Sequence, residues 1–248
     1  MKGTSEQQLL FKRLNERFAK ALAAYRLLAD DDCVLIGLSG GKDSLLLTEL
    51  MGRRTQILRP RFRVEAVHVR MENVSYETST DYLQQFCDQL HVPLHVVTTR
   101  FEESDSKPPC FLCSWNRRKQ MFNLAQQLGC NKIALGHHRD DLIHTALMNL
   151  TFQGRFGTMP ARLQMRKMPL SIIRPLCLID EADISRYAQL AGYQKVVKSC
   201  PHERETHRTS VASLFAAMEK MNPEARFSVW QALESAGKLV EEYLHMQI

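Results

Sequence analysis

The central motif of the chain is Cys33-Val-Leu-Ile-Gly-Leu-Ser-Gly-Gly-Lys-Asp-Ser-Leu-Leu-Leu47. Its first apolar run, Val34 to Leu38, is continuous and therefore predicts a strand buried on both faces, as in a parallel sheet. A polar turn at residues 39–44 ends this strand. Leucines then recur at a spacing that predicts a helix packed against the sheet.

The polar turn, Ser39-Gly-Gly-Lys-Asp-Ser44, has the chemistry of a phosphate-binding loop. Two adjacent glycines, Gly40 and Gly41, remove side chains where another group must approach the backbone closely. The serines and the N-terminus of the following helix offer O–H and N–H donors to an anion, and Lys42 adds a positive charge. The turn is not a Walker A loop, because that motif has four residues between its first glycine and its Gly-Lys pair.

The same six residues match the signature of the PP-loop ATP pyrophosphatases at every position. This resemblance implies a Rossmann-type fold of the adenine nucleotide α-hydrolase kind. It also implies that ATP is cleaved between its α and β phosphates, which gives an adenylated substrate and pyrophosphate. An ordinary strand–turn–helix junction is the alternative, and six consecutive matches in this context favour the nucleotide site.

The bulk composition is that of a globular protein with a basic surface. The chain has 248 residues, 44% of them hydrophobic, which fits one sizeable domain with or without an appendage. A net charge of +6 favours a polyanionic partner without demonstrating one. No apolar run is long enough to span a membrane, and residues 1–6 lack the apolar core of a signal peptide. We therefore expect a cytoplasmic protein.

Strand and helix patterns alternate on both sides of the central motif. Apolar runs predict further strands at residues 63–70, 93–98, 133–135 and 171–176. Near-helical periodicity predicts helices at residues 6–28, 80–90, 114–128 and 181–191, and another that ends near residue 150. The alternation predicts an α/β fold with a doubly wound parallel sheet, whose ligand lies beyond the carboxyl ends of the strands. Val69, at the end of the second strand, is then expected to meet the adenine.

Three segments are expected along the chain. They are an amphipathic N-terminal helix within residues 1–30, the PP-loop domain at 31–195, and a C-terminal part at 196–248 that is helical to its end. The basic side chains of the N-terminal helix suit either a partner or RNA surface, or the solvated face of a docking helix. We favour the docking helix.

Seven cysteines in a cytoplasmic chain argue against a disulfide framework. Four have apolar or strand-end settings and are assigned to structure: Cys33, Cys87, Cys130 and Cys177. The other three are Cys110, Cys113 and Cys200. The first two form a C-x-x-C at a predicted loop–helix junction, which suits a metal or iron–sulfur site, a redox pair, or neither. A closed zinc site of four cysteines is excluded, because there is no second C-x-x-C.

A polar cluster, Gly136-His137-His138-Arg139-Asp140-Asp141, directly follows the strand predicted at 133–135. It therefore falls at the same edge of the sheet as the phosphate loop. Paired carboxylates beside histidines could hold Mg²⁺ on the phosphates. The alternative is that Asp140 or Asp141 caps the next helix, and both roles are compatible. His144 is expected only at an exposed helix position.

Basic residues gather in two regions that could contact RNA. One follows the C-x-x-C and contains Arg117 and Arg118. The other is the stretch 151–166, which is expected to be irregular and contains Arg155 and Arg162. A glycine- and arginine-rich loop suits phosphate contacts, and it equally suits a flexible loop whose charge only aids solubility.

Motifs along most of the chain resemble the TtcA family of tRNA-modifying enzymes. They are Leu135-Gly-His-His-Arg-Asp-Asp141, the C-x-x-C followed by two arginines, Gly157-Thr-Met-Pro160, Ile173-Arg-Pro-Leu176, and the lone later Cys200. The resemblance implies an enzyme that converts cytidine 32 of the tRNA anticodon loop into 2-thiocytidine. It also implies ATP as co-substrate, Mg²⁺, and a 4Fe-4S cluster that three cysteines hold with one iron left open for sulfur.

Carried over residue by residue, the resemblance assigns the site as follows. The cluster ligands are Cys110, Cys113 and Cys200, and these act in catalysis together with Lys42 and Asp43. The ATP-binding positions are Ser39, Gly40, Gly41, Lys42, Asp43, Ser44, Val69, Gly136, His137, Asp140 and Asp141. The implied partners are tRNA and a sulfur donor such as a cysteine desulfurase, the implied assembly is a homodimer, and no membrane is involved.

Two positions depart from the family pattern. Glu203 stands where the family often has another cysteine, and His144 stands where related proteins often have Glu or Gln. Two other functions stay open at this point. One is a PP-loop pyrophosphatase or ligase that activates a different RNA base or a small molecule, with incidental cysteines. The other is a non-catalytic RNA-binding module, which would leave Lys42 and Asp43 without a role.

Overall fold

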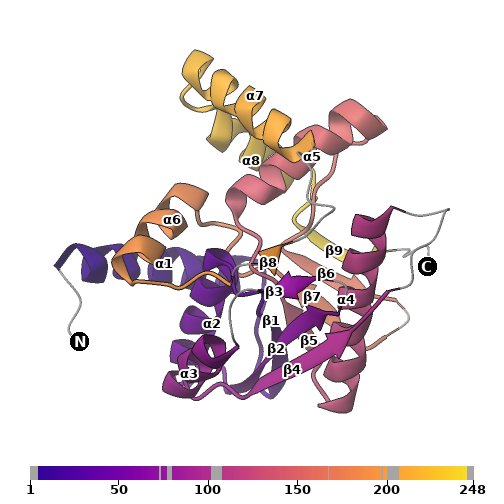
Figure 1. Cartoon of the computed structure of the whole chain (residues 1–248). Coiled ribbons are helices and arrows are strands. Elements are labelled where there is room, and N and C mark those ends of the chain that lie inside the picture. The colour runs from indigo at the N-terminus through magenta and orange to yellow at the C-terminus, as the bar shows by residue number, and fades with distance from the viewer. Residues whose placement is uncertain are drawn as a thin grey trace.

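The computed structural model describes residues 5–72, 74–76, 80–101, 108–166, 168–196, 198–199 and 207–244. Its helices are α1 Ser5–Ala24, α2 Lys42–Arg54, α3 Asp81–Gln89, α4 Pro109–Gln127, α5 Arg139–Gln153, α6 Glu181–Leu190, α7 His207–Met221 and α8 Ala225–Ser235. Its strands are β1 Asp32–Gly37, β2 Phe62–Met71, β3 Ser75–Tyr76, β4 Leu94–Thr99, β5 Lys132–Ala134, β6 Arg162–Met165, β7 Ser171–Ile173, β8 Lys198–Ser199 and β9 Val240–Leu244. Figure 1 shows their arrangement.

Seven strands form one sheet in the order β4-β2-β1-β5-β7-β6-β9. The strands from β4 to β7 are parallel, which confirms the predicted doubly wound α/β fold. The chain runs outward from β1 to β2 and β4, and then returns to β5 on the other side of β1. The strand order therefore reverses between β1 and β5, and this switch point is where such sheets bind ligands.

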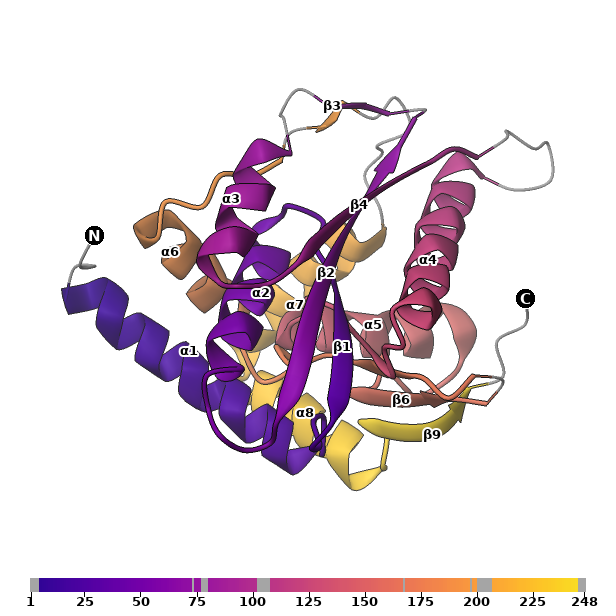
Figure 2. The same ribbon diagram turned by 90° about the horizontal axis from the view of Figure 1, so that it is seen from below.

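The two faces of the sheet are covered by different helices. Right-handed crossovers in opposite directions place helices on opposite faces. Accordingly, α4 lies on one side of β1 and β2, and α1, α2 and α3 lie on the other (Figure 2). Side chains of β1 alternate between the two faces: Val34 and Ile36 join the larger core, and Cys33 and Leu35 pack toward α4.

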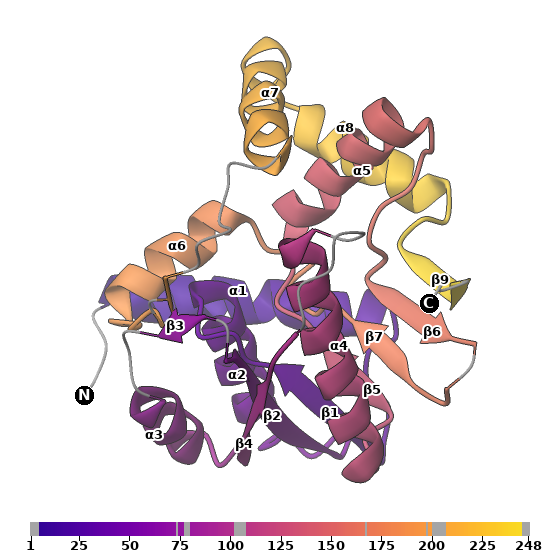
Figure 3. The same ribbon diagram turned by 45° about the vertical axis from the view of Figure 1, so that its right-hand side comes forward.

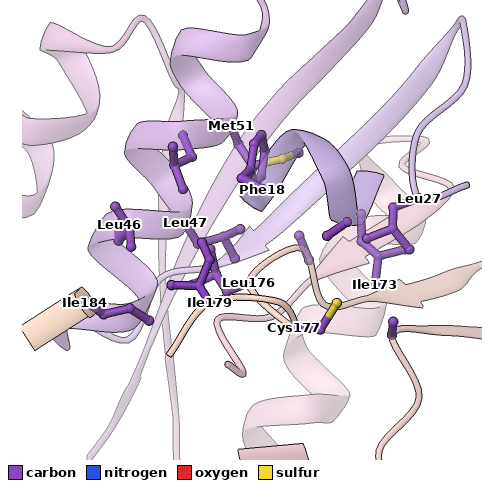
Figure 4. Close-up of a cluster of buried hydrophobic side chains, with 14 of the residues drawn as sticks. Phe18, Leu27, Leu46, Leu47, Met51, Ile173, Leu176, Cys177, Ile179 and Ile184 are labelled. Atoms are coloured by element: carbon purple, nitrogen blue, oxygen red, sulfur yellow. The ribbon is translucent and has the colours of Figure 1, made fainter. Parts of the chain in front are cut away.

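The larger core joins segments that are distant in the sequence. Phe18 of α1, Met51 of α2, Ile173 of β7 and Ile184 of α6 are buried together, as Figure 4 shows. Each such apolar side chain that is fully buried stabilises the folded state by about 1.5–3 kcal/mol relative to leaving it exposed. The end of α5 and helices α7 and α8 form a group at one end of the molecule (Figures 1 and 3).

The N-terminal helix docks on the domain, as favoured from the sequence. Its apolar side, including the fully buried Leu14, belongs to the larger core. Its basic side meets α6: Arg17 is bonded to Asp180 at 2.8 Å, and Arg13 to Asp183 at 2.5 Å. These arginines therefore face carboxylates of the same chain. No helix in the described ranges is both long and apolar enough to cross a bilayer.

Two sequence expectations about secondary structure are wrong. The C-terminal part is not helical to its end, because residues from Val240 form β9, which pairs in parallel with β6. The stretch 151–166 is not wholly irregular, because α5 continues to Gln153 and residues 162–165 form β6, antiparallel to β7. Pairing with another strand decides both strands, the sequence-distant β6 for β9 and the nearby β7 for β6, and local periodicity reports neither.

Candidate functional site

The phosphate loop lies between β1 and α2, at the switch point of the sheet. Gly40 adopts a φ of +82°, a conformation that glycine reaches without strain. A Cβ added there would lie 2.3 Å from Cγ2 of Val196, so a side chain does not fit. The Val196 backbone N–H also donates to the Gly40 carbonyl oxygen at 3.1 Å. The loop is thus held by the segment that follows α6.

Hydrogen-bond donors of the backbone and of two serines gather at the phosphate loop. Gly41 occupies the N-cap of α2 and has no side chain to occupy the free N–H groups of the first turn. The hydroxyls of Ser39 and Ser44 lie 3.1 Å apart, and Ser44 also donates to the Gly41 carbonyl oxygen at 2.9 Å. A helix N-terminus flanked by hydroxyls is a binding site for an anion such as a phosphate.

Lys42 supplies the positive charge of the loop. Its Nζ donates to the Asp43 carboxylate at 2.9 Å and to Glu181 of α6 at 3.0 Å. Burial alone would lower the pKa of Lys42, but these two carboxylates outweigh it and raise the pKa above its ordinary value. Lys42 is therefore charged at neutral pH, and it has two anionic partners that a phosphate could replace.

The second polar cluster begins where β5 ends, next to the phosphate loop. A Cβ at Gly136 would lie 3.1 Å from backbone atoms of Asp43 and Ser44, so this glycine lets the two segments approach closely. Asp141 takes part in capping α5, as one of the two predicted candidates, although the N-cap position itself is His138: the Asp141 carboxylate accepts a bond from the His138 N–H at 3.1 Å. The reason is that Asp141 reaches back from the third helical position.

Three charged or polar side chains from these two segments face one another. His138 Nε2 lies 3.4 Å from the Asp141 carboxylate and 3.9 Å from that of Asp43. Burial would lower the pKa of His138, but its carboxylate neighbours, first Asp140, raise it above the ordinary value. Asp43 and Asp141 thus both lie near the same ring nitrogen of His138.

Asp140 has different surroundings from its neighbour. Its carboxylate accepts a bond from Arg226 of α8 at 2.5 Å and from the Glu181 backbone N–H at 2.8 Å. Burial would raise the pKa of Asp140, but the nearby His138 imidazole and the bond from Arg226 lower it well below the usual range. Asp140 is therefore an anion that ties α5, α6 and α8 together.

A cavity of about 680 Å³ lies in front of the two segments, within the size range of small-molecule sites. Its lining is contributed by the ends of β1 and β5 and by α2, α5, α6 and α7: Gly37, Ser39, Asp43, Ser44, Leu135, Gly136, His137, His138, Asp141, His144, Glu181, Arg208, Thr209 and Ala212. The cavity is thus lined by six of the expected ATP-binding positions, together with other residues. Gly40, Gly41, Lys42, Asp140 and Val69 do not line it.

One histidine of the cavity is more buried than the sequence suggested, and a second has a strongly lowered pKa. His144 is not simply exposed: it is half-buried in the cavity wall, with its ring 5.8 Å from that of Phe215. Burial and the nearby Arg174 guanidinium lower the pKa of His137 to about 4. Its Nδ1 has no hydrogen-bond partner among the described residues. His137 is therefore neutral at physiological pH.

Residues that sequence reasoning did not assign complete the cavity. Glu181 begins α6, and Arg208 and Thr209 lie in the first turn of α7. Glu181 could have been found, because a helix that follows a parallel strand starts at the ligand edge of the sheet. Arg208, Thr209 and Arg226 gave no such signal, because their position depends on how α7 and α8 fold back.

The C-x-x-C lies within the first turns of α4. The sequence pattern predicts the two cysteines just before a helix at residues 114–128. The helix instead begins at Pro109, so both cysteines lie inside it. Cys110 is exposed, and Cys113 is half-buried against a small cluster that includes Phe101 and Met71. The third cysteine, Cys200, lies outside the described residues. The residue before it, Ser199, pairs with Ser75 in a two-stranded sheet.

The remaining cysteines and arginines fall into clear classes. The four cysteines assigned to structure, Cys33, Cys87, Cys130 and Cys177, are all buried, as expected. Arg117 is half-buried and Arg118 is exposed, both on the helix that carries the C-x-x-C. Arg155 is exposed beyond the end of α5, and Arg162 is half-buried in β6. Of these four arginines, only Arg117 and Arg118 lie on the same helix as Cys110 and Cys113.

Comparison with known proteins agrees with this geometry. The PP-loop domain matches residues 10–214, most of the chain. The tRNA-cytidine(32) 2-sulfurtransferase of Shewanella sp. (strain W3-18-1) is 30% identical over 241 residues, which cover 94% of this chain and 77% of the relative. The enzyme of the same name from Paraburkholderia xenovorans (strain LB400) is 31% identical over 240 residues, which cover 94% and 70%.

Among solved structures, the U34-tRNA thiolase NcsA from Methanococcus maripaludis, determined with its 4Fe-4S cluster, has a similar fold. Its TM-score is 0.75 at 24% sequence identity, and the match covers 95% of this chain and 81% of that one. The predicted resemblance is thereby confirmed. The chain belongs to the PP-loop domain family and, within it, to the family of the tRNA-cytidine(32) 2-sulfurtransferases, the TtcA family.

Proposed function

We propose that the protein is an ATP- and iron–sulfur-dependent tRNA thiolase, which replaces the oxygen at C2 of cytidine 32 by sulfur. The supporting observation is that the phosphate loop and the His-His-Arg-Asp-Asp segment border one cavity, in a chain of this family. The exposed Cys110 and its neighbour Cys113 lie on α4, the helix between β4 and β5. Because β4 is followed directly by the segment leading to α4, the cysteines lie beyond the carboxyl end of a sheet strand.

The reaction has two steps whose atoms balance. The O2 atom of cytosine attacks the α-phosphorus of ATP, the bond to the bridging oxygen breaks, and pyrophosphate leaves. The oxygen at C2, a poor leaving group, thereby becomes part of an adenylate. Sulfide then attacks C2, and AMP departs with the former O2 oxygen. Such phosphoryl chemistry depends mainly on positioning and on stabilising the charge that develops.

The residues of the phosphate loop suit the first step. The N–H groups of α2 and the hydroxyls of Ser39 and Ser44 would hold phosphate oxygens. Lys42 would exchange its bonds with Asp43 and Glu181 for bonds to the phosphates, and its charge would offset that of departing pyrophosphate. The neutral His137 adds a polar contact in the cavity without adding a second positive charge.

The carboxylates fit Mg²⁺ as a companion of ATP. Asp43 and Asp141 face the same imidazole at the cavity wall and provide the hard oxygen ligands that Mg²⁺ prefers. Within the described residues, no three ligating side chains are close enough to enclose a metal by themselves. This suits Mg²⁺, which keeps waters and substrate phosphates among its ligands. Asp140 would act indirectly, since Arg226 already binds it.

The cysteines fit an iron–sulfur cluster with three protein ligands. Cys110 and Cys113 are three residues apart on one helix, so their side chains project from the same side. Cys110 is exposed, and Cys113 packs in an apolar group at the ends of β2 and β4. Cys200, directly after β8, would supply the third thiolate. When bound, the cluster supplies an iron position for the sulfur that enters the base.

Several finer assignments accompany this proposal and rest on the family. We infer that Arg117, Arg118, Arg155 and Arg162 contact tRNA, since the chain carries a net charge of +6. Val69 would approach the adenine. A cysteine desulfurase would provide the sulfur, two chains would form a homodimer, and the enzyme would work in the cytoplasm. The division at residues 30 and 195 would separate the PP-loop domain from its two extensions.

The test is analysis of tRNA nucleosides by mass spectrometry in a strain from which the gene has been deleted. Loss of 2-thiocytidine is expected, with recovery by the intact gene but not by Cys110→Ser or Lys42→Met. Asn123→Ala, at an exposed position nearer the other end of α4, should restore the nucleoside and serves as the matched control. An unchanged nucleoside profile after deletion would contradict the proposed substrate.

Iron and sulfide analysis separates the two parts of the proposal. After anaerobic purification, the Cys110→Ser protein should hold less iron and acid-labile sulfide than the intact protein, and the Lys42→Met protein should hold equal amounts. ATP binding should show the opposite pattern. If Cys110→Ser retains both the cluster and the thiolation, the assignment of the ligands is wrong even if the substrate is right.

A further inference from the structure

Helix α4 presents one continuous exposed stripe that contains more than the cysteine pair. Its exposed members recur at positions that lie along one side of an α-helix: Cys110, Phe111, Ser114, Trp115, Arg118 and Lys119. Phe111 is 46% exposed and Trp115 is 39% exposed. Large aromatic side chains at such exposure are often part of an interaction surface. We call these six residues the α4 stripe.

The charge of the α4 stripe is positive. Lys119 lies over the Trp115 ring, with Nζ 5.3 Å from the ring centroid. The Arg118 side chain bonds to the hydroxyl and the carbonyl oxygen of Ser114 and stays exposed. No Asp or Glu occurs in the sequence from Pro109 to Gln127. The stripe thus combines aromatic faces with cations and contains no carboxylate.

The position of Trp115 relates it to the proposed chemistry. It lies two residues after Cys113 and five after Cys110, which corresponds to about 3 Å and about 7.5 Å along the helix axis. The other exposed aromatic residues of the described ranges, Phe152, Phe156 and Phe227, are not on this helix. An RNA loop that brings one base to the cysteines would therefore carry a neighbouring base past Trp115.

We propose that Trp115, assisted by Phe111, stacks against an unpaired base next to the modified one in the substrate RNA, with Lys119 and Arg118 beside the flanking phosphates. The inference rests on the proposed function, because it takes tRNA as the substrate. Single-stranded RNA is recognised by stacking of splayed bases on aromatic side chains and by cations along the backbone. The α4 stripe has both, and the lack of a carboxylate in it suits a polyanion such as RNA.

The protein itself contains an optical probe for this contact. It has two tryptophans, and the second, Trp230 of α8, is buried. Stacking of a base on Trp115 should quench the tryptophan fluorescence of the intact protein when a tRNA anticodon stem-loop is added. The Trp115→Phe protein should bind the same RNA with nearly unchanged affinity and show no such quench, because Trp230 is shielded from the RNA.

Binding affinities give the second readout. The dissociation constant of the full chain for the stem-loop, measured by fluorescence anisotropy at fixed salt, should rise about fivefold to a hundredfold in Trp115→Ala, as for one lost base stack. Phe227→Ala removes a 61% exposed aromatic side chain from α8 and should leave the affinity unchanged. Lys119→Ala should reduce the slope of log affinity against log salt by about one phosphate contact.

The outcomes distinguish this inference from the proposed function. Intact protein that binds and thiolates tRNA while Trp115→Ala binds RNA equally well would overturn the stacking role alone. Normal RNA binding by Trp115→Ala with impaired sulfur delivery from a protein donor would also overturn it, and would assign the α4 stripe to that donor. Failure of the intact protein to bind or thiolate tRNA would remove the proposed function and the inference with it.

Discussion

Replacing Arg226 by Met should destabilise the protein strongly, although Arg226 lies outside the lining of the cavity. Arg226 is the nearest cation to Asp140, at 2.5 Å, and the two side chains are 22% and 10% exposed. Removing one partner of a buried ion pair costs about 3–5 kcal/mol, because the other charge stays buried. We expect about 3 kcal/mol, the lower end, because the Arg226 side chain is partly hydrated. For a chain of this size, that lowers the Tm by about 6–12 °C.

A double-mutant cycle isolates the cause of this loss. Asp140→Asn removes the charge that Arg226 would otherwise leave behind, so Arg226→Met should cost less in that background. The difference should amount to about 1–3 kcal/mol of coupling, measured by urea unfolding. Arg13→Met is the matched control: Arg13 also bonds a carboxylate at 2.5 Å, but its side chain is 54% exposed. Its loss should cost less than about 1 kcal/mol.

The pH dependence gives an independent check of sign. In the intact protein the pKa of Asp140 is lowered in the folded state, so its contribution to stability is present above about pH 4 and is lost as the pH falls further. Without Arg226, burial should raise this pKa instead. The deficit of Arg226→Met should then shrink as the pH falls from 7, because protonation neutralises the buried group. Additive effects in the cycle, or a deficit that is constant with pH, would refute the reasoning.

Three further substitutions test the cavity. Gly40→Ala forces a φ of +82° on a residue with a side chain and a contact of 2.3 Å with Val196, so ATP affinity by calorimetry should fall more than about tenfold, and Val196→Gly should restore part of it. Glu181→Gln removes a half-exposed competitor for Lys42 and should tighten ATP binding by less than about fivefold; weaker binding would mean that Glu181 positions the lysine. His137→Gln should flatten the loss of stability between pH 6.5 and about 4, since the lowered pKa of His137 makes the unfolded state bind the proton more readily as the pH falls. An unchanged acid limb of the unfolding midpoint in that variant would exclude His137 as the cause.

The sequence predicted those parts of the structure that depend on local patterns. One short segment contains the apolar run of β1, the glycines of the phosphate loop and the leucines of α2. Its strand–loop–helix structure could therefore be predicted from the local pattern of residues. The same holds for the polar segment after β5. Parallel strands bring both segments to one edge, and this explains why two distant motifs could be assigned to one site.

The remaining features depend on contacts that no local pattern contains. Asp140 and Asp141 are adjacent, and successive residues of a helix point about 100° apart, so only the position of α8 decides which of them meets Arg226. Val240–Leu244 carries two glutamates and could form a helix by periodicity, but the open edge of β6 makes it a strand. The closure of the cavity by Arg208 likewise depends on the path of α7.

The hydrogen bond between Val196 and Gly40 has a thermodynamic consequence. One stretch of backbone contacts the phosphate loop at Val196, forms β8 at residues 198–199, and leads directly to Cys200. A shift of the loop when ATP binds would therefore act on the segment that precedes a cysteine of the proposed cluster. Binding free energies are reciprocal, so whatever factor ATP imposes on cluster affinity, the cluster imposes on ATP affinity. The ratio of the ATP affinities measured with and without the cluster therefore gives the coupling free energy between the two sites.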